Sequence, residues 1–116
     1  MSDVKITVGG ALEDESSQRF IKAWRRAERG ETFRERHLAF ESWDALSRLL
    51  TRRRMELLSY VRRHDVASVR GLAKALRRDY SNVHADVKAL TAAGLLDTAD
   101  GGVRAEYDEI ETRIAI

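Results

Sequence analysis

Residues 68–94, SVRGLAKALRRDYSNVHADVKALTAAG, contain the pattern that decides the fold. Apolar residues recur at helical spacing on both sides of a short polar turn, which predicts two short amphipathic helices. Their inward positions are Leu72, Ala73 and Leu76 in the first helix and Val83, Val87 and Leu90 in the second. Ser68 and Asp79 stand where N-caps are expected. The stretch therefore predicts two helices joined by a tight turn.

The residues that follow predict a hairpin. Leu95 and Leu96 precede a turn signal, Asp100-Gly101-Gly102, and a strand-like tail comes after it. Helix, turn, helix and hairpin is the order of a winged helix-turn-helix, whose second helix enters a DNA groove. The expected fold class is α+β, mainly α, with a winged helix-turn-helix, an N-terminal strand–helix extension and a C-terminal strand.

The N-terminal part predicts a strand and a helix. Val4, Ile6 and Val8 alternate before two glycines, which is typical of a short strand. A helix is expected from Ser16 or Ser17 to about Gly30. Residues 32–41 are ambiguous, although His37 to Phe40 suits a short strand. We assign residues 1–41 to an extension for dimerisation or partner contact.

Residues 42–116 are expected to form the DNA-binding domain with its C-terminal strand. Ser42 and Thr51 are candidate caps for two helices that precede the helix-turn-helix. The tail, EYDEIETRIAI, alternates so that one face holds Ile110, Thr112, Ile114 and Ile116. This pattern predicts a half-buried strand running to the last residue. With the N-terminal strand it suggests a small sheet, which a second subunit could complete.

Charge is segregated along the chain. The net charge is +2, but residues 51–96 hold ten basic and four acidic side chains, a net of +6. Residues 97–116 hold two basic and six acidic side chains, a net of −4. A phosphate-binding surface needs positive charge where the helix-turn-helix has it. The alternative is a solvated basic face without a partner.

Several function classes are disfavoured. The chain has no cysteine and three scattered histidines, which offer no metal cluster. No apolar run approaches the roughly 20 residues of a membrane span, and the first residues do not form a signal peptide. We find no nucleophile with a base and no phosphate-binding glycine loop. The expectation is a cytoplasmic protein that is not an enzyme and uses no cofactor, metal or membrane.

The second helix, 80–93, is expected to lie in the major groove. The residues expected to contact bases are Ser81, Asn82, His84, Ala85 and Lys88. Those expected to contact phosphates are Arg52, Arg53, Arg70, Lys74, Arg77 and Arg78. The expected wing residues are Gly101, Gly102 and Arg104. Ser81 and Asn82 could instead act only as caps.

Residues 38–110 resemble small prokaryotic winged helix-turn-helix transcriptional regulators of the MarR/ArsR-like class, including antitoxin-like proteins. The similarity is carried by LAFESWDALSRLLTRRRMELLSYV, by AKALRRDYSNVHADVKALTAAGLL and by YDEI. The chain differs from that pattern because it has no proline before the first helix of the helix-turn-helix or before YDEI. The resemblance implies a sequence-specific regulator, such as a repressor, that binds double-stranded DNA as a homodimer at a near-palindromic site.

Two further hypotheses concern partners. The chain could be an antitoxin-type interaction module that neutralises a toxin protein through an exposed strand edge, and it could also repress its own operon. The candidate dimer-interface residues are Ile110, Ile114 and Ile116. Phe20, Trp24 and Trp43 are the other apolar candidates, although such residues are more often ordinary core.

Overall fold

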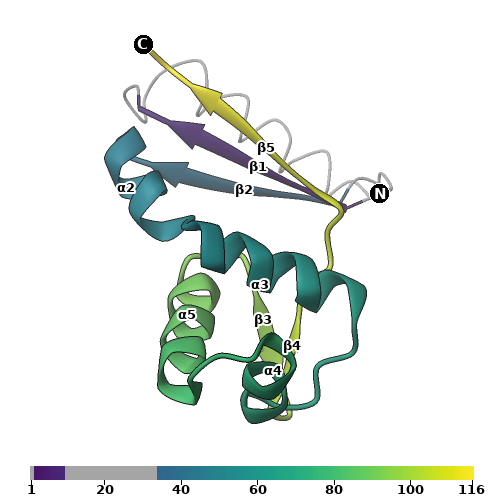
Figure 1. Cartoon of the computed structure of the whole chain (residues 1–116). Coiled ribbons are helices and arrows are strands. Elements are labelled where there is room, and N and C mark those ends of the chain that lie inside the picture. Colours follow the sequence, from purple (N-terminus) through teal and green to yellow (C-terminus); the bar gives the residue numbers. More distant parts are fainter. Residues whose placement is uncertain (1, 10–33) are drawn as a thin grey trace. The chain divides into compact units, whose positions relative to one another are not determined.

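The computed structural model describes residues 2–9 and 34–116 and has an α+β fold (Figure 1). The described helices are α2 (Trp43–Leu49), α3 (Arg52–Arg63), α4 (Val69–Leu76) and α5 (Tyr80–Ala92). The described strands are β1 (Ser2–Val8), β2 (Arg34–Phe40), β3 (Asp97–Ala99), β4 (Gly102–Arg104) and β5 (Glu109–Ile114). The helix expected from Ser16 or Ser17 to Gly30 lies outside the described residues, as do Phe20 and Trp24.

The chain divides into two compact units. The sheet unit comprises Met1–Ser47 and Tyr107–Ile116, and the helical unit comprises Arg48–Glu106. The sequence predicts the boundary between residues 41 and 42, with the C-terminal strand in the DNA-binding domain. The structure instead groups β5 with the N-terminal strands, because β5 pairs with β1.

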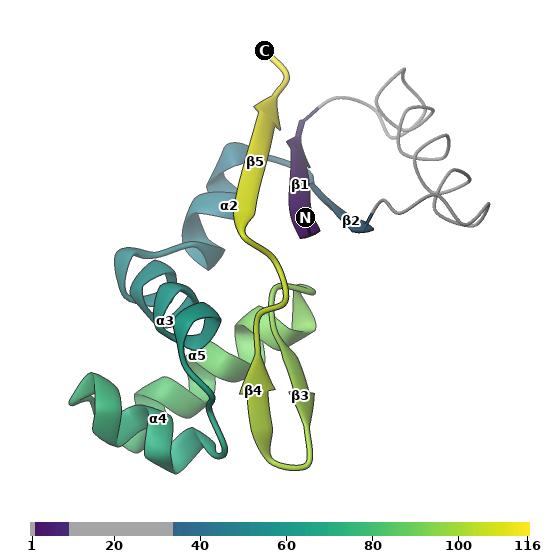
Figure 2. The same ribbon diagram turned by 90° about the vertical axis from the view of Figure 1, so that its right-hand side faces the viewer.

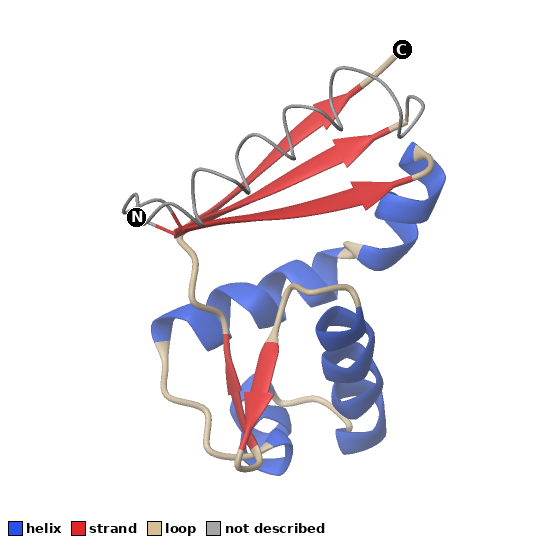
Figure 3. Ribbon diagram, turned by 180° about the vertical axis from the view of Figure 1, so that it is seen from behind, coloured by secondary structure: helices blue, strands red, loops and turns tan. Residues whose placement is uncertain are grey.

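The described strands of the sheet unit run in the order β2-β1-β5, and both outer strands are parallel to β1 (Figure 3). Val4, Ile6 and Val8 of the central strand are at most 2% exposed, as their alternation predicts. The expected sheet of N- and C-terminal strands is therefore present. The strand suggested at His37–Phe40 is also present and begins earlier, at Arg34.

Strand β5 is less buried than its alternating pattern predicts. Only Ile110 is half-buried, whereas Ile114 is 51% exposed and the strand ends there, before Ile116. The prediction of a half-buried strand to the last residue is thus wrong for its C-terminal half. The reason is that β5 is an edge strand, which β1 flanks on one side only.

The helices begin at the polar residues expected to cap them. The hydroxyl oxygens of Ser42, Thr51 and Ser68 accept hydrogen bonds from backbone N–H groups three residues later. Asp79 caps α5 in the same way. Arg77 ends α4 in the left-handed conformation, with φ of 55°, and its backbone N–H donates to the Lys74 carbonyl. Local side-chain chemistry therefore fixes where each of these helices begins.

The core of the helical unit comes from the inward faces of its three helices and from the chain after α5. All of its apolar side chains are at most 5% exposed. They are Leu57, Leu58 and Val61 from α3, Leu72 and Ala73 from α4, Val83, Val87 and Leu90 from α5, and Leu95, Leu96, Val103 and Ala105 beyond it. This set contains all the inward positions predicted for residues 68–94 except Leu76, which is half-buried.

Strands β3 and β4 form a tight antiparallel hairpin (Figure 2). Its two turn residues, Asp100 and Gly101, have φ of 53° and 79°, which are the positive values that a type I′ turn needs. Val103 also forms an antiparallel bridge with Val66, whose carbonyl accepts its N–H at 3.0 Å. The hairpin is therefore tied to the segment that precedes α4.

Gly102 allows this close approach. A Cβ atom at residue 102 would lie 2.9 Å from the Val66 carbonyl oxygen. The Gly102→Ala variant is therefore expected to lose about 1–3 kcal/mol of unfolding free energy, as overpacked sites do. Urea unfolding would measure this loss, with Thr98→Ala in the same hairpin as the control. Equal unfolding midpoints for Gly102→Ala and the parent chain would contradict it.

Candidate nucleic-acid interface

Helix α5 has one buried face and one exposed face. Val83, Val87 and Leu90 are buried on the first. The opposite face carries small or polar exposed residues, namely Ser81, Ala85, Lys88 and Ala92. His84 and Asn82 flank it on either side and are also exposed. The five residues expected to contact bases are therefore all accessible on the outer side of α5.

The N-terminus of α5 is capped by Asp79 rather than by Ser81 or Asn82. The Asp79 carboxylate accepts the backbone N–H of Asn82 at 3.3 Å. Ser81 and Asn82 follow Tyr80, the first residue of α5, so neither occupies the cap position. The alternative that these two residues only cap the helix is thereby removed, and their exposed side chains can contact a ligand.

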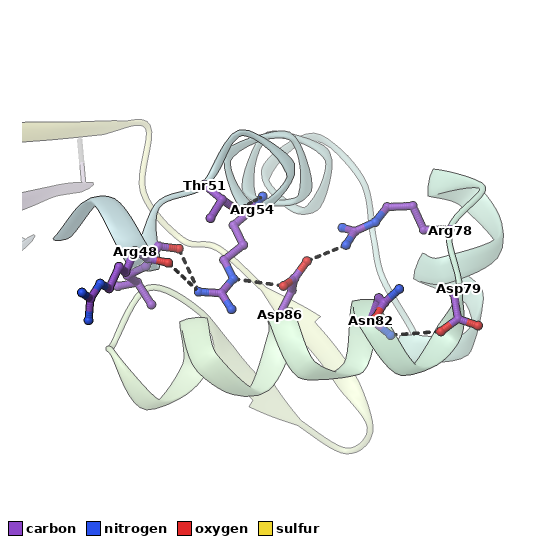
Figure 4. Close-up of polar contacts among 8 residues, drawn as sticks. Arg48, Thr51, Arg54, Arg78, Asp79, Asn82 and Asp86 are labelled. Atoms are coloured by element: carbon purple, nitrogen blue, oxygen red, sulfur yellow. Dashed lines mark hydrogen bonds and ion pairs between the residues drawn. The ribbon is translucent and has the colours of Figure 1, made fainter. Parts of the chain in front are cut away.

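Asp86 anchors the side of α5 that flanks its buried face (Figure 4). Its carboxylate accepts a hydrogen bond from Arg54 Nε of α3 at 3.0 Å and one from Arg78 Nη2 of the α4–α5 turn at 2.7 Å. Arg54 Nη1 also donates to the carbonyl oxygens of Arg48 and Leu49, at 3.3 and 3.0 Å. The Arg54–Asp86–Arg78 cluster thus joins α3, the turn and α5.

The charges of this cluster act on the pKa of Asp86. Burial raises the pKa of this carboxyl, but the hydrogen bonds and positive charges of Arg78 and Arg54 outweigh burial and hold it below its ordinary value. Asp86 is therefore ionised when the protein is folded at neutral pH. The carboxylate pairs with two arginines whose side chains are themselves mostly buried, Arg54 at 21% exposed and Arg78 at 15% exposed.

The cluster removes Arg78 from the exposed basic surface. The sequence predicts that Arg78 contacts phosphate, but its side chain is mostly buried and paired with Asp86. Sequence reasoning did not identify Arg54 or Asp86 as important. A signal was available for Asp86, because a helical wheel places it beside the inward position of Leu90 rather than on the outer face. Nothing local indicates that its partner lies 32 residues earlier.

The other basic residues expected to contact phosphates are exposed. Arg52 pairs with Glu56 at 3.3 Å in the first turns of α3, and both side chains are mostly in solvent. Arg53, Lys74 and Arg77 are exposed as well, on α3, on α4 and in the α4–α5 turn. Exposed ion pairs such as Arg52–Glu56 contribute little to stability and are readily exchanged for another anion.

Tyr80 is an exposed aromatic residue that the sequence did not single out. The Arg70 guanidinium lies 5.0 Å from the centre of its ring, and the ring of His84 lies 5.8 Å away. Tyr80 is 42% exposed at the first turn of α5. Arg70, Tyr80 and His84 therefore form a polar and aromatic cluster that joins α4 to the start of α5.

The expected wing residues lie on the β3–β4 hairpin. Gly101 is in the turn, Gly102 begins β4, and Arg104 ends it. Arg104 is exposed and lies 3.9 Å from the Glu106 carboxylate. The candidate dimer residues Ile110, Ile114 and Ile116 belong to the sheet unit instead and are not part of this interface.

Within residues 2–9 and 34–116, no group of three or more His, Cys, Asp or Glu side chains could hold a metal ion. Nor is any helix in this part of the chain long and apolar enough to cross a membrane.

Comparison with known proteins identifies a family. The model of the HVO_A0114 family matches residues 49–112, which is more than half of the chain. The matched range contains α3, α4, α5, the hairpin and most of β5. The chain matches no curated protein and no solved structure.

Proposed function

The chain belongs to the HVO_A0114 family, and we propose that it is a sequence-specific DNA-binding transcriptional regulator. In this proposal the helical unit is a winged helix-turn-helix, α5 is its recognition helix, and the β3–β4 hairpin is its wing. The observation that carries the proposal is the outer face of α5, which is small, polar and exposed while the opposite face is packed into the core.

The side chains of this face suit contact with base edges. Ser81 and Ala85 are short, which allows the helix backbone to approach the floor of the major groove. Asn82 can bind an adenine through two hydrogen bonds, and Ala85 can contact a thymine methyl group. Lys88 lies nearly two turns after Ser81 on the same face and can donate to a guanine. His84 completes the contact set.

The proposed phosphate contacts come from exposed basic residues around α5. Arg77 is in the turn directly before α5, and Lys74 and Arg70 lie on α4. Arg52 and Arg53 in the first turn of α3 are further candidates. Arg78 is not one of the proposed phosphate contacts, because its side chain binds Asp86. Such contacts set the position and affinity of the protein without distinguishing sequences.

The wing and the assembly complete the proposal. Arg104, at the end of β4, is the proposed contact with the DNA backbone or the minor groove beside the site that α5 would occupy. Regulators of this kind bind near-palindromic sites as two-fold dimers, so that two recognition helices lie about one turn of DNA apart. We therefore propose a homodimer as the DNA-binding form.

Two variants separate base contact from phosphate contact. Lys88→Ala is expected to weaken binding to the preferred DNA fragment by about 1–3 kcal/mol while changing binding to unrelated DNA much less. Arg77→Ala is expected to weaken both alike and to reduce the dependence of log K on log salt by about one. Fluorescence anisotropy with fragments from the protein's own locus and with shuffled fragments would measure both effects.

Lys88→Arg is the matched control, because it keeps the charge and should leave non-specific binding and the salt dependence unchanged. The proposal is wrong if the parent chain shifts no fragment of its own locus even at low salt. It is also wrong if Lys88→Ala and Arg77→Ala have the same effect on every fragment.

A further inference from the structure

Strand β5 has a polar backbone edge that no described strand pairs. The N–H of Ala115 donates to the Val8 carbonyl at 2.9 Å, so the odd-numbered residues direct their backbone groups towards β1. Backbone groups alternate along a strand. The N–H and C=O groups of Ile110, Thr112 and Ile114 therefore point away from β1, to the outer edge of the sheet. Unpaired edges of this kind favour pairing with another strand.

The sequence of β5 is complementary to itself when two copies run antiparallel about Thr112. In that register Thr112 faces Thr112, Ile110 faces Ile114, and Glu111 faces Arg113. The two residues on each side of Thr112 thus meet an apolar partner where they are apolar and an opposite charge where they are charged. Both kinds of cross-strand pair stabilise a sheet.

The direction of the backbone groups selects the same register. Residues that face each other across an antiparallel pair must both direct their backbone groups to the shared edge, or both away from it. Odd residues can therefore pair only with odd residues, and even residues with even ones. Centring the pair on Glu111 would place Glu111 against itself, and centring it on Arg113 would do the same for that arginine. Of the registers centred on residues 111, 112 and 113, the one centred on Thr112 is the one without like charges directly opposite each other.

We propose that β5 forms the dimer interface by pairing antiparallel with β5 of a second copy, with Thr112 on the two-fold axis. This deepens the proposed function, because it assigns the interface of the proposed DNA-binding homodimer. The two sheets join into one continuous sheet in which β5 of each copy is flanked on both sides. The arrangement is isologous, as two-fold dimers require.

The two faces of the joined sheet receive different contacts. Ile110 and Ile114 share a face with Val4 and Val8, their register partners in β1. Pairing extends this apolar face across the axis and brings the second copy's Ile110 against Ile114, which is 51% exposed in the single chain. Glu111 and Arg113 meet on the other face, at a non-hydrogen-bonded position, where opposite side chains lie closest.

Charge reversal tests the register without DNA. Arg113→Glu and Glu111→Arg each place like charges opposite each other twice per dimer, so each is expected to raise the dimer dissociation constant about ten- to a hundredfold. An equal mixture of the two variants restores opposite charges at both positions and should form a heterodimer. The double variant, Glu111→Arg with Arg113→Glu, should form a homodimer again. Sedimentation velocity or light scattering gives the mass, and thermal melting followed by circular dichroism shows that each variant is folded.

A single cysteine gives an independent test, because the chain has none of its own. In the proposed register the two residues at position 112 have Cα atoms about 5.5 Å apart, a separation that a disulfide spans. Thr112→Cys should therefore cross-link two copies under mild oxidation. Ile114→Cys is the control and should not, since its two thiols are out of step by four residues, about 13 Å along the strand.

The outcomes decide the proposal. A monomeric parent chain, a dimer that Arg113→Glu leaves intact, or cross-linking by Ile114→Cys but not by Thr112→Cys would each overturn it. None of these measurements involves DNA. Failure of the interface is therefore distinct from failure of the proposed function, which rests on binding to a DNA fragment.

Discussion

The Asp86→Ala variant is expected to lose about 3 kcal/mol of unfolding free energy, within the range measured when one partner of a buried ion pair is removed. Arg54 and Arg78 are mostly buried and lie 3.0 and 2.7 Å from this carboxylate. Without it, both positive charges would stay in a poorly solvated site and face each other. Urea unfolding at neutral pH measures the loss.

A combined substitution is the matched control for this prediction. Asp86→Leu together with Arg54→Met and Arg78→Met replaces the whole cluster with apolar groups of similar size. Replacing a complete buried cluster in this way is often neutral or stabilising, so the triple variant is expected to be more stable than Asp86→Ala. Two nitrogens of Arg78, Nε and Nη1, are buried without a hydrogen-bond partner, which adds to the cost of keeping this charge inside.

The dependence of stability on pH identifies the carboxylate as the cause. The pKa of Asp86 is lower in the folded chain than its ordinary value. Its contribution to stability is therefore fully present above the pKa of the unfolded chain, about 3.9, and is lost as the pH falls through the lower folded value. Asp86→Asn should remove that part of the acid dependence. Parallel pH profiles for Asp86→Asn and the parent chain would contradict the assignment, as would an Asp86→Ala variant as stable as the parent chain.

The parts of the fold that sequence predicted well are those with local causes. Each cap residue, such as Ser68 or Asp79, acts on an N–H group three residues away. The Asp100-Gly101 turn depends on two residues that tolerate positive φ. The inward faces of α4 and α5 depend on a helical repeat within one element. These signals need no knowledge of the rest of the chain.

The parts that sequence missed depend on residues far apart in the chain. The alternation in residues 4–8 and 110–116 predicts strands and suggests one sheet, but it does not show that β5 is parallel to β1 at an edge. Edge position explains why Ile114 is exposed. Likewise, the basic run in residues 52–54 indicates a phosphate-binding surface. It does not show that Arg54 turns inward to Asp86 while Arg52 and Arg53 stay outside.

Separating the two copies is expected to weaken DNA binding although no DNA contact is removed. Arg113→Glu should lower the affinity for the two-fold DNA site about ten- to a hundredfold, the factor by which it raises the dimer dissociation constant, because forming the complex of two copies on one fragment includes forming the contact between the copies. Lys88→Ala, by comparison, is expected to cost about 1–3 kcal/mol. Arg113 belongs to the sheet unit, whereas the proposed DNA contacts all belong to the helical unit. Anisotropy titrations of one fragment with both variants compare the two losses directly.

The mixture of Arg113→Glu with Glu111→Arg shows whether the loss comes from assembly or from charge. A lost negative charge at Glu111 would be expected to favour DNA binding by itself, and a lost positive charge at Arg113 to oppose it. If assembly is the cause, both single variants bind weakly, and the mixture recovers most of the affinity as the heterodimer forms. If Arg113→Glu is monomeric and still binds the fragment as tightly as the parent chain, one copy suffices for recognition, and the dimer is not the DNA-binding form. If Glu111→Arg is monomeric but binds more tightly, charge outweighs avidity at this site.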